Sequence, residues 1–364
     1  MGGHTISDIA QALGLRAEGD LSCRVSGASE PASATQADLA IALDRSFAEG
    51  LAQGAAVAAL MWDDADWQSY GLKAAILTPR GRFAMAGITG LLDPGPQIAP
   101  GIHPSAVIDP TAEIADGAAI APLAVVGPHA RIGANARIGS HVSIGAGAEI
   151  GENALLLDGV RIGARVHIGD RFIAQPGVVI GGDGFSFVTP ERGAIEEVRA
   201  NLGDAGGLRQ QKYARIHSLA AVCIGHDVEV GSNSSIDRGT VRDTEIGNGT
   251  KIDSLVQIGH NARIGDDCLL CGQVGIAGSS ILGNRVVLGG QCGVTDHLTL
   301  GDDVIAGAGT LLRTNQPAGR IMLGNPAMPM QTSIDAYKAL RRLPRLLADI
   351  TALKKKLSKA EGND

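Results

Sequence analysis

The sequence predicts a left-handed parallel β-helix that follows a small α/β domain and precedes an α-helical tail. An aliphatic residue recurs every six positions in two long runs, and the segments before and after these runs lack that period. Glycine accounts for 51 of the 364 residues, while aromatic residues make up only 3%. Many tight turns around small aliphatic positions explain this composition better than a globular aromatic core.

The six-residue period defines the β-helix. Counting in sixes from Ile102 to Ile168 meets an aliphatic residue at every step, often followed by glycine, and a second run extends from Ile246 to Leu300. Three hexapeptides make one triangular coil whose aliphatic side chains point inward and stack on their equivalents one coil away. We infer the left hand from the repeat class, because ordinary crossovers favour the right hand.

The domain boundaries follow from where the period starts, breaks and stops. Residues 1–98 mix a helical opening with short apolar runs and predict an α/β domain, and residues 99–328 predict the β-helix. Residues 181–215 break the period with a polar, glycine-rich stretch, which predicts an external loop. A shift of four residues between Arg238 and Glu245 predicts a small insertion at a corner. Residues 329–364 predict a basic helical extension that Pro344 kinks or splits.

Charge and cysteine content limit the function classes. A formal net charge of −7 gives no overall positive field for phosphate backbones, so we expect no nucleic-acid partner. Five cysteines are an odd number spread over a long chain, which favours a reducing cytoplasm. Neither a leader peptide nor an apolar run of about 20 residues is present, so we expect at most peripheral membrane association.

Two features that resemble cofactor-binding motifs do not meet the requirements of such a site. Cys268 and Cys271 form a CxxC, but no second pair completes a tetrahedral zinc site, so we expect no metal. The glycine strings lack the lysine of a phosphate-binding loop and are interpreted as corners.

Two histidines are candidates for acid–base chemistry. His260 and His297 follow in-phase aliphatic residues and are 37 residues apart, close to two coils, which places them on one edge about 10 Å apart. Asp253 lies one hexapeptide before His260, from where its carboxylate could hold the imidazole. Surface histidines and a solvated aspartate are the alternatives, since seven other histidines occur in the chain.

Four segments resemble the UDP-3-O-acylglucosamine N-acyltransferase family of lipid A biosynthesis. They are IGGDGFSF from Ile180, SSIDRGTVRDTEIGNGTKIDSLVQIGHNARIGDD from Ser234, GGQCGVTDH from Gly289 and GNPAMP from Gly324. The resemblance spans nearly the whole chain. It implies a homotrimer with sites between subunits, a 3-hydroxyacyl donor on acyl carrier protein, no further cofactor, and the 2-amino group of UDP-3-O-(3-hydroxyacyl)glucosamine as acceptor.

The resemblance also implies roles for individual residues. His260 is the general base, Asp253 orients it, His297 supports it, and the Gly278 N–H is the oxyanion donor. Phe47 would hold the uracil, although Ile41 stands where a second aromatic is usual. The implied substrate-binding residues in the β-helix are Asp183, Phe185, Gln257 and Arg313.

Three alternatives remain open. The first is an O-acyltransferase on UDP-N-acetylglucosamine, which the N-terminal domain argues against because that relative begins almost directly with hexapeptides. The second is a nucleotide-sugar acetyltransferase that uses acetyl-CoA, and the third is a purely structural β-helix in which His260 can be replaced without loss of function.

Overall fold

The computed structural model describes residues 3–191, 211–324 and 327–361. The chain divides into two compact units, Met1–Gln97 and Ile98–Asp364. The first boundary lies one residue before the one that the sequence suggested, and the C-terminal helix is grouped with the second unit.

The N-terminal unit is an α/β sandwich around a five-stranded sheet. Its strand order is β2 (Arg16–Gly19), β7 (Ala74–Thr78), β6 (Ala58–Trp62), β5 (Asp38–Ala42) and β4 (Gly27–Ser29), with β2 antiparallel to β7 and the other pairs parallel. A short antiparallel pair joins β1 (His4–Thr5) to β3 (Arg24–Val25). The helices are α1 (Ile6–Leu13), α2 (Arg45–Ala48), α3 (Gly81–Leu92) and the 3-10 turns η1 (Glu49–Ala52) and η2 (Trp67–Tyr70).

Local sequence explains the start and end of α1. Thr5 caps the helix through a reciprocal pair of hydrogen bonds with Asp8, and Gly14 ends it in the left-handed conformation. Buried Ile6 and Ile9 then pack with Ile88 of α3 in one of the two hydrophobic clusters of this unit.

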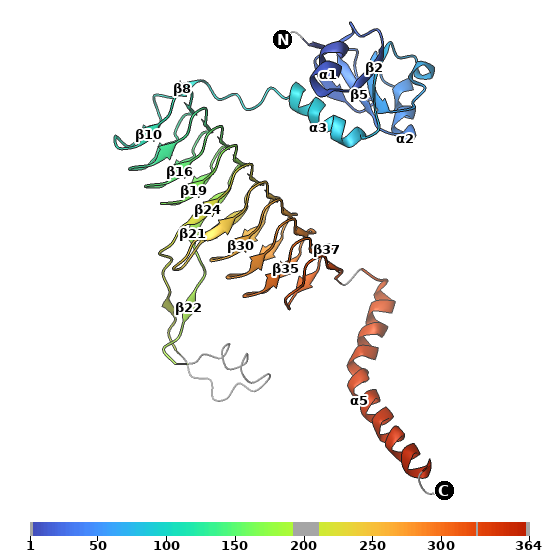
Figure 1. Cartoon of the computed structure of the whole chain (residues 1–364), viewed down its shortest axis with the longest axis vertical. Coiled ribbons are helices and arrows are strands. Elements are labelled where there is room, and N and C mark those ends of the chain that lie inside the picture. Colours follow the sequence, from blue (N-terminus) through green and yellow to red (C-terminus); the bar gives the residue numbers. More distant parts are fainter. Residues whose placement is uncertain (1–2, 192–210, 325–326, 362–364) are drawn as a thin grey trace. The chain divides into compact units, whose positions relative to one another are not determined.

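The second unit is a parallel β-helix of three sheets (Figure 1). Sheet I has 11 strands: β8 (Gly101–Ile102), β11 (Ala119–Ile120), β14 (Arg137–Ile138), β17 (Leu155–Leu156), β20 (Ile173–Ala174), β25 (Glu229–Val230), β28 (Lys251–Ile252), β31 (Leu269–Leu270), β34 (Val287–Leu288), β37 (Ile305–Ala306) and β39 (Ile321–Met322). Sheet II has 10 strands: β9 (Val107–Ile108), β12 (Val125–Val126), β15 (Ser143–Ile144), β18 (Arg161–Ile162), β21 (Val179–Asp183), β26 (Ser235–Arg238), β29 (Gln257–Ile258), β32 (Gly275–Ile276), β35 (Gly293–Val294) and β38 (Leu311–Leu312). Sheet III has nine strands: β10 (Glu113–Ile114), β13 (Arg131–Ile132), β16 (Glu149–Ile150), β19 (His167–Ile168), β24 (Val222–Ile224), β27 (Thr244–Ile246), β30 (Arg263–Ile264), β33 (Ile281–Leu282) and β36 (Thr299–Leu300).

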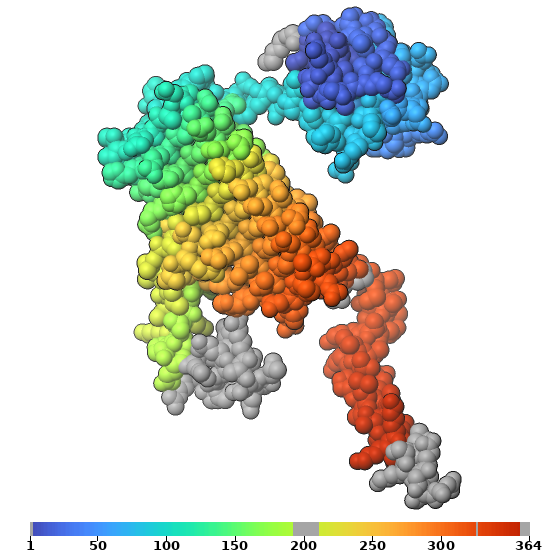
Figure 2. All heavy atoms as spheres, in the orientation of Figure 1, coloured from blue at the N-terminus to red at the C-terminus, as the bar shows by residue number. Residues whose placement is uncertain are grey.

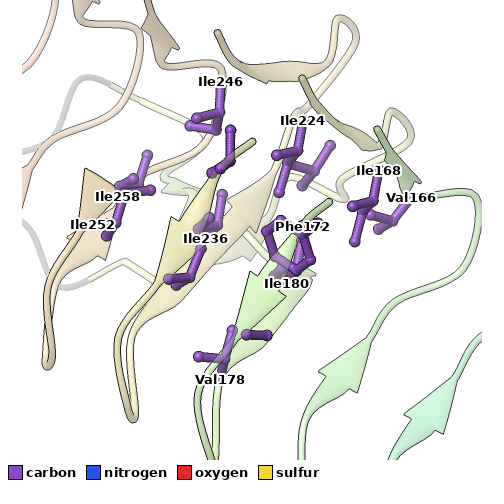
Figure 3. Packing of buried hydrophobic residues seen from close by; sticks show 14 of the residues in the cluster. Val166, Ile168, Phe172, Val178, Ile180, Ile224, Ile236, Ile246, Ile252 and Ile258 are labelled. Carbon is purple, nitrogen blue, oxygen red and sulfur yellow. The ribbon is translucent and has the colours of Figure 1, made fainter. Parts of the chain in front are cut away.

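The register confirms the predicted six-residue period. Ile120 pairs with Ile138 and Ile258 with Ile276, each 18 residues and one coil apart. The in-phase aliphatic side chains point into the space between the sheets, where Phe172 is fully buried among them (Figure 3). In the space-filling view the coils form one continuous surface from green to orange (Figure 2).

The corners carry the conformational strain of the coil. Eighteen non-glycine residues of the β-helix have positive φ, among them Leu123, Leu255 and His297, and they recur at multiples of six. At the corners between sheets III and I, side chains compensate by bonding to the preceding coil. Asn248, for example, accepts from the His226 N–H at 2.8 Å, and Asp266 accepts from the Asn248 N–H at 2.7 Å.

Both predicted interruptions are present, with one correction. Ile180 pairs with Ile236, 56 residues later, so 38 residues beyond one coil are inserted at this corner. The external loop begins three residues later than predicted, because residues 181–183 lie in β21, which continues to pair with β26 as far as Asp183 and Arg238. The loop then forms an antiparallel arm of β22 (Phe187–Val188) and β23 (Ala214–Arg215), which runs away from the coils (Figure 1). Residues 192–210 of the predicted loop lie outside the described residues.

The C-terminal segment is one helix, α5 (Met330–Glu361), and Pro344 lies inside it without splitting it. Its side chains from Met330 to Lys356 are exposed. Of the helices described, none combines the length and the apolar character needed to cross a bilayer.

Candidate active site

The IDRG segment, residues 236–239 at the end of β26, extends from the hydrophobic core to the cavity that His260 lines. Ile236 is fully buried in the core, and the Arg238 guanidinium donates to the carbonyl oxygens of Ala220 and Ala164 at 2.8 and 2.6 Å. A Cβ at Gly239 would lie 1.7 Å from the Arg242 carbonyl oxygen, so glycine is required there. Three residues of the motif are therefore structural, and Asp237 alone lines the cavity.

His260 lies at the corner between sheets II and III, directly after β29. Its imidazole is enclosed by two glycines. A Cβ at Gly184 would lie 2.7 Å from the His260 Cβ, and one at Gly278 would lie 2.9 Å from both Cε1 and Nε2. Since real Cβ atoms do not approach this closely, both glycines are needed to admit the ring in this position.

Asn261 determines which ring nitrogen of His260 carries the proton. Its Oδ1 lies 3.0 Å from His260 Nδ1 and also accepts from the Thr240 N–H at 3.2 Å. Its Nδ2 donates to the Arg242 carbonyl oxygen at 2.7 Å, which fixes the orientation of the amide. Because Oδ1 can only accept, Nδ1 is the protonated nitrogen, and Nε2 keeps its lone pair.

A cavity of about 430 Å³ contains these groups. It is lined by Asp183, Phe185, Asp237, Gln257, Gly259, His260, Ile276, Ala277 and Gly278. Within the described part of the chain, the Gly278 N–H donates to no protein acceptor. The cavity thus combines a histidine base with a backbone donor, the pair that acyl transfer requires.

A second cavity, of about 510 Å³, continues along sheet II. It shares Gln257, Ile276 and Ala277 with the first cavity, so the two form one groove. Gly275 leaves room along this groove, since a Cβ there would meet nothing within 4 Å. Leu311 stands at its far end, where its Cδ1 would lie 3.0 Å from a Cβ at Gly293.

The two carboxylates of the His260 cavity differ in their surroundings. Asp183 forms an ion pair with Arg215 at 3.2 Å, and the Arg215 guanidinium also lies over the Phe187 ring. Burial raises the pKa of Asp237, while a hydrogen bond from Gln257 and the proximity of His260 lower it by less. Asp237 has no ion-pair partner among the described residues.

The structure brings five of the predicted site residues together in one cavity, and three others of the β-helix, His297, Arg313 and Asp253, do not line it. Asp183, Phe185, Gln257, His260 and Gly278 line one cavity. His297 lies on the same edge as His260, and its N–H donates to the Gly278 carbonyl oxygen at 3.2 Å, but its side chain is exposed and it does not line either cavity. Arg313 is exposed at the next corner along this edge.

The expected contact of Asp253 with His260 is not formed within the chain. One hexapeptide is one side of the triangle, so Asp253 follows β28 at the corner between sheets I and II and is separated from His260 by β29. Its carboxylate lies beside Ser254, Cys271 and Gly272 instead.

Phe47 belongs to the other compact unit. It is about half exposed on α2, where the Asp44 carboxylate caps its N–H. Ile41 lies in β5 and packs against the α1 and α3 cluster. Since isoleucine has no aromatic ring, Ile41 cannot stack on a base beside Phe47.

Sequence reasoning missed three residues of the site. Asn261, Asp237 and Gly184 lie inside the motifs that carry the resemblance, but their roles depend on contacts with residues of other coils, which the sequence does not show. Among the described residues, no group of three or more His, Cys, Asp or Glu is placed to hold a metal.

These features define a hexapeptide-repeat acyltransferase. A family model described as bacterial transferase hexapeptide (six repeats) matches residues 111–146, 123–158 and 243–278. A UDP-3-O-acylglucosamine N-acyltransferase of Ruegeria pomeroyi is 60% identical over 98% of both chains, and one of Paracoccus denitrificans is 58% identical over 98% of this chain and 97% of its own. The chain belongs to the UDP-3-O-acylglucosamine N-acyltransferase family.

A solved structure shares the fold. The UDP-N-acetylglucosamine acyltransferase of Arabidopsis matches with a TM-score of 0.52 at 22% identity, covering 62% of this chain and 71% of its own.

Proposed function

We propose that the protein transfers a 3-hydroxyacyl group from acyl carrier protein to the 2-amino group of UDP-3-O-(3-hydroxyacyl)glucosamine. The product is a UDP-2,3-diacylglucosamine, and no further cofactor takes part. One observation carries the proposal: the Nε2 of His260 keeps its lone pair, beside the Gly278 N–H and at one end of a long groove.

The residues of the cavity divide the reaction between them. As the amine nitrogen bonds to the thioester carbon, His260 Nε2 takes one of its protons, and the Gly278 N–H stabilises the negative oxygen. When the carbon–sulfur bond breaks, the imidazolium returns the proton to the sulfur. The groove from Gln257 to Leu311 would hold the acyl chain, because its glycines leave an open apolar channel.

The partners follow from the family and from charge. We propose that the chain works as a homotrimer in the cytoplasm and contacts membranes at most peripherally. The basic residues of α5 and Arg313 would face the acidic carrier protein. Phe47 would stack on the uracil, as a half-exposed ring can.

The test compares the intact protein with His260→Ala and with the matched control His141→Ala, which lies outside both cavities. Transfer is measured from 3-hydroxyacyl carrier protein to UDP-3-O-acylglucosamine, by the amide product. We expect His260→Ala to lose about two to four orders of magnitude in rate and the control to keep the rate. Full transfer by His260→Ala would exclude this mechanism, and acetyl transfer from acetyl-CoA by the intact protein in its place would favour the acetyltransferase alternative.

A further inference from the structure

Asp237 is a charged group of the His260 cavity that has no role in the proposed acyl transfer as described. It is half-buried beside the base, on the same side of the coil as His260 and Gly278. The other carboxylate of the cavity, Asp183, is matched by Arg215, and the neighbouring Arg238 is occupied by two backbone carbonyls.

The surroundings of Asp237 leave its charge uncompensated within the described chain. Gln257 supplies one hydrogen bond, and His260, the charged group that acts on Asp237, is neutral in the state that accepts a proton. A buried carboxylate is costly unless a donor or a cation accompanies it. A ligand that brings N–H groups or positive charge to Asp237 would offset this cost.

We infer that Asp237 recognises the amino group of the acceptor and makes the site selective for an amine over a hydroxyl. This inference rests on the proposed function of the His260 cavity.

The number of protons on the nucleophile gives the chemical reason. A hydroxyl carries one proton, which must pass to His260 Nε2, and it has none left for Asp237. A neutral primary amine carries two. One proton passes to Nε2 as the nitrogen–carbon bond forms, and the other N–H donates to the Asp237 carboxylate.

Asp237 also stabilises the charge that develops during attack. The nitrogen becomes positive as it bonds to the carbonyl carbon, and a carboxylate at hydrogen-bonding distance favours that charge. After the proton has moved through His260 to the sulfur, the amide nitrogen is neutral and has one N–H. Asp237 exchanges no proton and makes no covalent bond, so it acts as a specificity-determining residue.

The experiment uses the full-length protein and the near-isosteric variant Asp237→Asn, whose amide keeps a hydrogen bond with Gln257. Binding of UDP-3-O-acylglucosamine is measured by calorimetry in the absence of donor, against the analogue that carries a hydroxyl at the same carbon. We expect the intact protein to prefer the amine and the variant to lose about 10-fold or more of that preference. Asp303→Asn, which removes an exposed carboxylate outside the cavity, should keep the preference.

Measuring the affinities over a range of pH distinguishes recognition of the amine by Asp237 from a structural role of Asp237. In the intact protein, affinity for the amine should fall as the pH rises and the ligand loses its positive charge, while affinity for the hydroxyl analogue stays constant. In Asp237→Asn the fall should be much smaller. His260, Asp183 and its partner Arg215 also face the cavity and are unchanged in both proteins.

Equal preference for the amine in the intact protein and in Asp237→Asn would overturn the inference. So would a loss of affinity that is the same for both ligands, since that outcome indicates a general structural role. Because binding is measured without donor, the result holds even if the intact protein forms no amide, which would count against the proposed function alone.

Discussion

The Asn261 amide oxygen lies 3.0 Å from Nδ1 of His260 and leaves Nε2 as the basic nitrogen. The amide is held in this orientation by the Arg242 carbonyl oxygen and the Thr240 N–H, which belong to the four-residue insertion after β26. A small irregularity in the repeat thus determines the tautomer of the candidate base.

Replacing Asn261 by aspartate tests this arrangement. The carboxylate still accepts from Nδ1 and Thr240, but its negative charge stabilises the imidazolium, and it cannot donate to the Arg242 carbonyl oxygen. We therefore expect the acid limb of the kcat/KM profile to move to higher pH, because a smaller fraction of the imidazole is then in the basic form at a given pH. An unchanged pH profile of amide formation would contradict the role of Asn261.

Substitution of Gly184 tests the position of the His260 ring, and substitution of Gly182 is the matched control. Gly184→Ala would bring a methyl group to 2.7 Å from the His260 Cβ, whereas a Cβ at Gly182 meets nothing within 4 Å. We expect Gly184→Ala to lower kcat at least about 10-fold with little change in thermal unfolding, because it displaces the ring, and Gly182→Ala to retain activity. Equal activity of the two variants would show that the ring position is not critical.

We expect Leu311 to limit the length of acyl chain that the groove accepts. Leu311→Ala removes the side chain that closes the far end, so longer acyl chains should be accepted. We expect the ratio of kcat/KM for a donor two carbons longer to rise about 10-fold relative to the intact protein, since each buried methylene contributes about 0.8 kcal/mol. Leu123→Ala, at a distant corner, is the control and should leave the ratio unchanged.

Cys223 should be almost inert to alkylation at neutral pH. Burial, assisted by a hydrogen bond to Asp243, raises the pKa of its thiol to about 11. At pH 8 only about one thiol in a thousand is then ionised, and the thiolate is the reactive form. Peptide mass spectrometry after iodoacetamide treatment should show slow labelling of Cys223 and faster labelling in Asp243→Asn.

The raised pKa of Cys223 also makes the stability of the folded protein depend on pH. Between about pH 8.5, the ordinary thiol pKa, and pH 11, the unfolded chain has lost this proton while the folded chain retains it. The free energy of unfolding should therefore fall as the pH rises through this range. Cys223→Ser should show a smaller fall, and an identical pH dependence would contradict the assignment.

The sequence predicted the β-helix because its core repeats at a fixed interval. Inward residues such as Ile258 and Ile276 depend only on local periodicity, and both pair as expected. The position of His260 on an outer edge followed from the same period. The groups that position His260 did not follow from the period. Gly184 belongs to the first interruption of the repeat, and Thr240 and Arg242, which orient Asn261, belong to the second. Periodicity does not specify the conformation of these interruptions. No contact of Asp253 with His260 forms within one chain, because a separation of seven residues places Asp253 at a different corner of the triangle.

The 18-residue spacing of paired residues also governs how the groove can evolve. The gain or loss of a whole coil between β29 and β38 would change the distance from His260 to Leu311 by one strand spacing, about 4.8 Å, and leave every other pairing in register. Substitution of Leu311 by a smaller or larger residue changes the usable length of the groove by less than one strand spacing. The number of coils would thus set the acyl chain length of the product in large steps, and the size of the side chain at position 311 would set it in smaller ones.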